Sequence, residues 1–199
     1  MVRKILLIML LLLAMSGVCA ADSVNLQLSA GSHSVTGDIS AKRYIPSGFM
    51  KFGGGFVYTH DGGTEYKFAA LHLTAGSETL APGLTCDFGL RALGGKAEDD
   101  SHSGDLGVLG FTGNVNYLFP HEMIPIPLEV FGALTWAPSV LSVEDSDGYL
   151  EWTLGTGIRI VQNVSIIGTY TKYRMDMKSG PGDWRLNDDV LQLGMVLSF

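Results

Sequence analysis

The chain ends in the stretch Leu191-Gln192-Leu193-Gly194-Met195-Val196-Leu197-Ser198-Phe199, in which every second residue is a large apolar one. Side chains alternate between the two faces of a β-strand, so this stretch predicts a strand whose apolar face continues to the last residue. A buried final strand of a soluble protein rarely keeps two distinct faces to its end. The pattern instead predicts a strand that closes a membrane barrel and carries its assembly signal, through Leu193, Met195, Leu197 and Phe199.

The same alternation recurs along the chain and is clearest in residues 84–92, 107–119 and 149–161. The segments are about ten residues long, which lets a tilted strand cross the hydrocarbon layer, whereas strands of soluble proteins usually have about five or six residues. The expected strands are 22–31, 37–45, 48–59, 64–75, 83–94, 107–118, 127–137, 148–161, 164–176 and 189–199.

These segments predict an all-β fold, a transmembrane antiparallel up-and-down β-barrel of ten strands with both termini in the periplasm. Strands 37–45, 64–75 and 164–176 have mixed faces. In the last of them, Lys172 has the same parity as the aromatic Tyr170. If two of these segments are not true spans, the barrel has eight strands.

The expected connections differ between the two ends of the barrel. One set is short or carries proline: 44–48, 77–83, 120–127 and 162–164. The other set is mostly longer and acidic: 96–106, 137–148 and 178–189. Short periplasmic turns and longer external loops are typical of bacterial outer-membrane barrels. Aromatic residues near the strand ends predict interfacial girdles, formed by Tyr58, Tyr117, Phe119, Trp136, Trp152 and Tyr170.

The N-terminus is unlike the rest of the chain. Arg3 and Lys4 precede an apolar run over residues 5–15, and small residues follow at 17–21. This layout predicts a secretory signal peptide over residues 1–20, with cleavage after Ala20 or Ala21 and the barrel over 21–199. The apolar run is shorter than the about 20 residues that a membrane helix needs.

The composition excludes several classes of protein. The formal net charge of −7 argues against nucleic-acid binding, because phosphate contacts need a basic face. Cys19 is expected to leave with the signal peptide, so Cys86 remains alone and no intramolecular disulfide can form. Gly53-Gly54-Gly55 lacks the Lys and Ser/Thr of a phosphate-binding loop. We expect no cofactor.

The second half carries Phe131-Gly132, the stretch from Trp136 to Ser142, an acidic loop, Tyr149-Leu150-Glu151, Gly157-Ile158-Arg159 and residues 166–173. Together these elements resemble the YfaZ family of bacterial outer-membrane proteins, over residues 94–199 and more loosely at 58–63. The proline-bearing turn at 120–127 departs from the family pattern. The resemblance implies a small barrel in a Gram-negative cell envelope and no established activity.

Charged residues on the polar face of the strands are expected to line the lumen, where they must pair, because an isolated buried charge is costly. Glu129 begins one strand and Arg159 ends its neighbour, which predicts a salt bridge near the periplasmic rim. Arg91 and Glu151 are expected higher up and could meet across the lumen. The full lumen charge network is Lys51, Asp87, Arg91, Glu129, Glu151 and Arg159.

Two other groups of residues could carry chemistry. The acidic loops lack an ordered spacing of ligands, so solvated loops are expected, bridged to lipopolysaccharide phosphates by divalent cations. They contain Glu98, Asp99, Asp100, His102 and Asp105, and Glu144, Asp145 and Asp147. The adjacent pairs Ser32-His33 and Ser101-His102 fall in expected loops and offer no oriented nucleophile and base.

The sequence therefore predicts a monomeric, non-enzymatic outer-membrane barrel of structural or surface-interaction type. Its expected partners are outer-membrane lipid, lipopolysaccharide and, during assembly, the barrel-insertion machinery. A narrow porin-like channel for small solutes is the first alternative, and a lipid-modifying outer-membrane enzyme is the second.

Overall fold

A computed structural model of the chain describes residues 21–179 and 182–199. The signal peptide expected at residues 1–20 lies outside the described residues. Over the two described ranges, no helix is long and apolar enough to cross a membrane.

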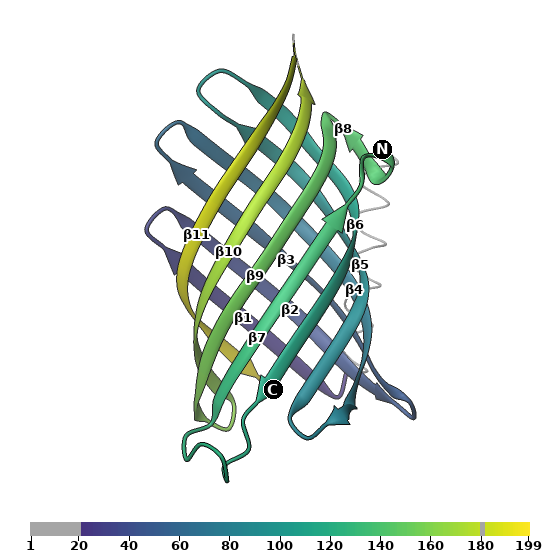
Figure 1. Ribbon diagram of the computed structural model, residues 1–199, viewed down its shortest axis with the longest axis vertical. Helices are drawn as coiled ribbons and strands as arrows, with labels where there is room; N and C mark the ends of the chain where they lie inside the picture. The colour runs from purple at the N-terminus through teal and green to yellow at the C-terminus, as the bar shows by residue number, and fades with distance from the viewer. Residues whose placement is uncertain (1–20, 180–181) are drawn as a thin grey trace.

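The chain forms a closed antiparallel barrel, in which each long strand pairs with the next (Figure 1). β1 also pairs with β11, so the sheet has no open edge, and Val24 and Phe199 exchange two backbone hydrogen bonds at the seam. The ten barrel strands confirm the predicted all-β antiparallel barrel and its strand count, and the eight-strand alternative is wrong. They are β1 Ser23–Gly31, β2 Ser34–Ile45, β3 Gly48–Asp61, β4 Thr64–Ala81, β5 Leu84–Glu98, β6 Ser103–Leu118, β7 Leu128–Ala137, β9 Ser146–Val161, β10 Val164–Ser179 and β11 Gly182–Ser198.

A short excursion joins β7 to β9. It contains the single 3-10 turn η1, Ser139–Leu141, and the three-residue strand β8, Ser142–Glu144. β8 pairs with the upper part of β6, beyond the point where β7 ends. We call the end of the barrel that holds Asp22 and Phe199 the terminal end, and the opposite end, where β8 lies, the far end.

Several strands are much longer than a membrane requires. β4, β6, β9, β10 and β11 have 18, 16, 16, 16 and 17 residues, against about 9–11 for a transmembrane strand. In β6, β10 and β11 the excess lies at the far end, whereas β4 continues to Ala81 at the terminal end. The long acidic loops expected at 96–106 and 178–189 are therefore a wrong prediction. These residues mostly continue the strands, with β5 reaching Glu98 and β10 reaching Ser179.

The two faces of the strands exchange character partway up the barrel, and β10 shows how. Its lower part directs Ile166 outward, with 52% of its surface exposed, and Thr169 inward. Above Tyr170 the outward positions become charged, beginning with Lys172, while the inward residues Tyr173 to Met177 are large and buried at alternate positions. This exchange is the reason that the faces of segment 164–176 look mixed in the sequence.

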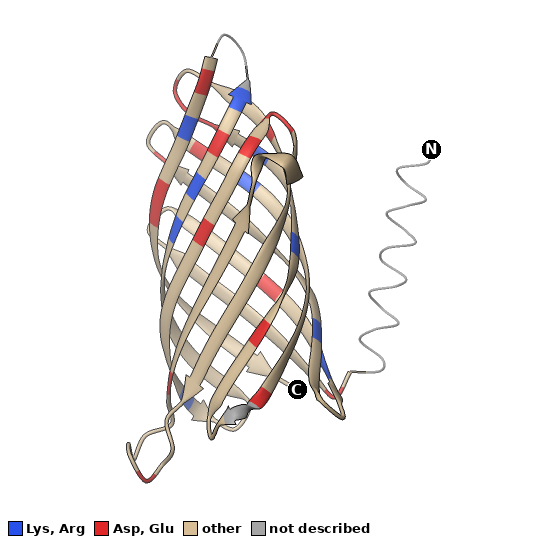
Figure 2. Cartoon of the chain, turned by 45° about the vertical axis from the view of Figure 1, so that its right-hand side comes forward, with Lys and Arg blue, Asp and Glu red and all other residues tan. Residues whose placement is uncertain are grey.

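The whole barrel follows the same rule. Lys, Arg, Asp and Glu gather towards the far end of the strands, and much of the lower wall is free of them (Figure 2). The lower wall exposes large apolar side chains instead, such as Phe88 and Leu193. The lower barrel therefore has an apolar outside and a polar inside, and the upper barrel has the reverse.

Candidate functional site

The upper lumen is filled by a compact group of apolar side chains, which we call the apolar plug. Its members come from β3 to β7 and from β9 to β11, so they meet across the axis rather than line one wall. Six large members are buried to 4% exposure or less: Tyr66, Phe68, Tyr149, Tyr173, Met175 and Met177. Trp184, also a member, is 8% exposed. These side chains therefore pack against one another inside the upper barrel.

Aromatic rings form the centre of the plug. The Tyr66 and Tyr173 rings lie 5.4 Å apart, and Phe68 packs edge-on against both Tyr149 and Tyr173. The Tyr66 hydroxyl donates a 2.7 Å hydrogen bond to a carboxylate oxygen of Asp188 on β11. A buried tyrosine usually needs such a partner, so this bond ties β4 to β11 across the lumen.

Below the plug the lumen opens into a polar cavity of about 740 Å³, which we call the vestibule. Residues near the terminal end, among them Asn25 and Ser198, also line it. Its size is within the usual range for small-molecule sites. The polar side chains of its middle level are Gln27, Asp38, Lys51, His72, Asp87 and Asn114.

Arg91 and Glu151 meet where the vestibule reaches the plug, as expected for two charges facing each other across the lumen. The guanidinium Nη1 donates to the Glu151 carboxylate at 2.6 Å and reaches the Thr135 hydroxyl at 3.4 Å. The Tyr149 hydroxyl donates to the second oxygen of Glu151. The pair thus links the polar vestibule to the lower surface of the plug.

The predicted salt bridge between Glu129 and Arg159 is wrong. Both residues line the vestibule, yet no ion pair joins them within 4.0 Å. In the strand register Glu129 lies directly opposite Gly157, and Arg159 is two residues further along β9. The Glu129 carboxylate lies over Gly157, where an added Cβ would meet its Oε1 at 2.6 Å.

The remaining members of the expected charge network face the lumen without forming ion pairs with one another. Asp87 accepts a 2.6 Å hydrogen bond from the Asn114 side chain on β6. Lys51 lines the vestibule opposite Thr74, and among the described residues it has no carboxylate within 4.0 Å. Of the six predicted charges, one pair is therefore joined directly.

Sequence reasoning missed a contact between Asp38 on β2 and His72 on β4, whose carboxylate oxygen and Nδ1 lie 3.6 Å apart. The two side chains reach each other over β3 because Gly53 and Gly55 have no side chains. A Cβ at Gly53 would meet His72 Nε2 at 2.4 Å, and one at Gly55 would meet Asp38 at 3.0 Å. The glycine triplet was a signal that could have located this contact.

The far-end turns place the remaining candidates. Asp99 caps its own hairpin: it accepts hydrogen bonds from the backbone N–H groups of Ser101 and His102 and contacts the His102 ring at 3.0 Å. The Ser101 N–H bond is the main cause that lowers the pKa of Asp99. His33 lies 3.8 Å from Asp61 in the neighbouring turn. Within the described residues, no group of three or more His, Cys, Asp or Glu side chains is arranged to hold a metal ion.

Comparison with known proteins adds little to this picture. No protein family model matches the chain, so the resemblance to the YfaZ family stays a prediction. No curated protein matches it either.

Among solved structures, the chain is similar to Neisserial surface protein A, with 11% identity, a TM-score of 0.36 and coverage of 89% of this chain and 94% of the other. The NanC porin gives 8% identity, a TM-score of 0.38 and coverage of 88% and 98%. CarO of Acinetobacter baumannii gives 13% identity, a TM-score of 0.35 and coverage of 92% of this chain and 99% of the other. Because the identities and TM-scores are this low, we base no inference on these three proteins.

Proposed function

We propose that the chain is an integral outer-membrane β-barrel of structural or surface-interaction type, non-enzymatic and closed to solutes. The observation that carries this proposal is the exposed apolar belt on the outside of the lower barrel. Phe88, Leu154 and Leu193 expose 69%, 58% and 73% of their surface there. In water such a belt would be a severe aggregation liability, whereas hydrocarbon covers it at no cost.

Aromatic side chains support a membrane boundary at the top of this belt. The Trp152 and Tyr170 rings lie 5.2 Å apart on the outer wall, and Phe111 and Trp136 lie 6.4 Å apart beside them. Lys172 is directly across from Trp152 on the neighbouring strand. Aromatic rings followed by charges are typical of the place where a barrel wall leaves the lipid.

An even number of barrel strands returns both ends of the chain to one side, and we propose that this side is the periplasm. The proposal can be tested by labelling single cysteines in a Cys86→Ser background with a membrane-impermeant maleimide. His33→Cys, in a far-end turn, should react on intact cells, and Ser47→Cys, in a terminal-end turn, only after the outer membrane is opened. The reverse pattern would invert the proposed orientation, and equal labelling of both in intact cells would exclude insertion.

The apolar plug favours a closed barrel over the porin-like alternative. In planar bilayers the intact protein should show no discrete openings, while a variant with Phe68→Ala and Tyr173→Ala should gain some if it still migrates as a folded barrel on gels. Reproducible openings by the intact protein would instead support a channel. The proposal also includes membership of the YfaZ family and a monomeric state. It further includes contacts with outer-membrane lipid and with the barrel-insertion machinery during assembly.

A further inference from the structure

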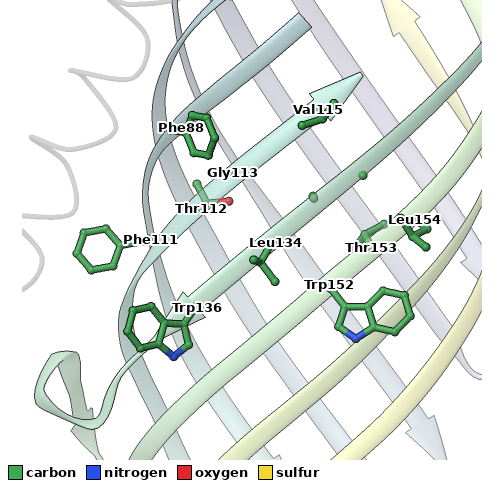
Figure 3. Close-up of a pocket in the computed structure, with 12 residues that line it drawn as sticks. Phe88, Phe111, Thr112, Gly113, Val115, Leu134, Trp136, Trp152, Thr153 and Leu154 are labelled. Atoms are coloured by element: carbon green, nitrogen blue, oxygen red, sulfur yellow. The ribbon is translucent and has the colours of Figure 1, made fainter. Parts of the chain in front are cut away.

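The lipid-facing wall is not smooth, because a groove of about 460 Å³ is cut into it over β5, β6, β7 and β9. Figure 3 shows the rings of Phe88, Phe111, Trp136 and Trp152 standing around it. Its floor includes Gly113, where a Cβ would meet the Phe88 ring at 2.8 Å. The Phe88 ring therefore lies over Gly113 and forms one wall of the groove.

Gly132 is the second glycine of the groove, and it points outward between Val130 and Leu134 on β7. A Cβ there would come no closer than 3.4 Å to Leu154, so the position is open towards the membrane rather than filled. The groove walls are almost entirely hydrocarbon and aromatic. A linear acyl chain matches this chemistry, since it can fill the hollow without leaving a polar group unsatisfied.

Positive charges lie beside the upper end of the groove. The strand register places Lys172 across from Trp152 and Arg174 across from Leu150. Their side chains remain 42% and 43% exposed although each contacts a carboxylate. Lys172 contacts Asp189, and Asp176 is shared by Arg174 and Arg185. Three cations therefore share two carboxylates in these ion pairs. Exposed guanidinium and ammonium groups of this kind suit phosphate.

We propose that the groove and these cations form a specific site for one phosphorylated, multiply acylated glycolipid of the lipopolysaccharide class. One acyl chain would lie over Gly132, beside the Phe88 ring, and a phosphate would contact Lys172 and Arg174. The inference rests on the proposed outer-membrane location, because the far end then meets the leaflet that contains this lipid. Cations on two successive outward positions also fit a headgroup with more than one phosphate better than a single phosphodiester.

Native mass spectrometry of the folded mature barrel, titrated with purified lipid A in detergent, tests the site. Gly132→Leu should fill the groove, and the double variant Lys172→Gln with Arg174→Gln should remove the phosphate contacts. Each should weaken retention of the first lipid A molecule by about tenfold, the effect of losing one good contact. Two matched controls should change it less than about twofold. Gly168→Leu fills an outward glycine of β10, and Lys67→Gln with Lys96→Gln removes two upper-wall cations from β4 and β5.

Three results would overturn the proposal. The controls could weaken binding as much as the site variants, phosphatidylglycerol could bind as tightly as lipid A, or the protein could form a lipid-free dimer that Gly132→Leu disrupts. Migration as a folded barrel on gels excludes misfolding as the cause. Cysteine labelling on cells separates this failure from failure of the membrane proposal, since a correctly inserted barrel that ignores lipid A refutes only the site.

Discussion

The ion pair between Arg91 and Glu151 offers a quantitative test of how the barrel interior is stabilised. The two side chains are only 18% and 9% exposed, and their nitrogen–oxygen distance is 2.6 Å. Glu151→Ala would leave the guanidinium without a carboxylate and the Tyr149 hydroxyl without an acceptor. Removing one member of a buried pair costs roughly 3–5 kcal/mol. Because Arg91 borders the vestibule, we expect the lower figure, about 3 kcal/mol, or roughly a hundredfold change in the unfolding equilibrium.

The double variant Arg91→Met with Glu151→Leu removes both charges and their desolvation cost, so it should lose less than about 1 kcal/mol. The matching single variants, Arg91→Met and Glu151→Leu, each leave one charge of the pair without its partner, so the cycle should show a coupling energy of at least about 2 kcal/mol. Urea unfolding of the barrel in lipid vesicles, followed by tryptophan fluorescence and gel migration, gives these free energies. The reasoning is refuted if Glu151→Ala costs less than about 1 kcal/mol, or if the double variant costs as much as the two single variants together.

Three smaller predictions follow from the same structure. Glu129→Gln should change the urea unfolding free energy by less than about 0.5 kcal/mol, because Glu129 has no ion pair with Arg159; a loss above about 2 kcal/mol would reveal one. Tyr66→Phe keeps the packing of the plug but leaves Asp188 without its donor, so the same assay should show a loss of about 1–3 kcal/mol, and no loss would refute the bond. Asp99 has a lowered pKa, so its turn is stabilised above the unfolded-state pKa and loses that stabilisation as the pH falls through the lowered value. The protection of the Ser101 amide against hydrogen exchange, relative to an unstructured peptide at the same pH, should fall over that acid range in the native protein but not in Asp99→Ala.

The sequence predicted the barrel well because its strongest signal is local. Alternation in segments such as 107–119 depends only on which face each side chain takes, and the C-terminal strand repeats it without interruption to Phe199. The strand count followed from these segments and from the turns between them.

Alternation alone does not predict the apolar plug, because it shows that a strand has two different faces but not what surrounds each face along its length. On β10, Lys172 stays on the same outward face as the apolar residues below it, and Tyr173 stays on the same inward face as the polar residues below it. Only the surroundings of each face change. The pairing of Glu129 failed for a different reason. The residue directly opposite Glu129 is Gly157 rather than Arg159, and exact register depends on turn geometry that composition does not specify.

Along β10 and its neighbours, the outer surface of the barrel changes from apolar in the lower part to charged in the upper part. The barrel is therefore amphipathic along its axis as well as across its wall. Pushing it deeper would carry the Lys172 level into hydrocarbon, where a charge costs roughly 2–4 kcal/mol at the bilayer midplane. Lifting it would expose the lower belt, with Leu154 and Ile166, to water. Each direction is opposed by several strands at once. In the outer membrane that we propose for it, the depth of the barrel would therefore be set by the strands themselves, and its turns could change without altering that depth.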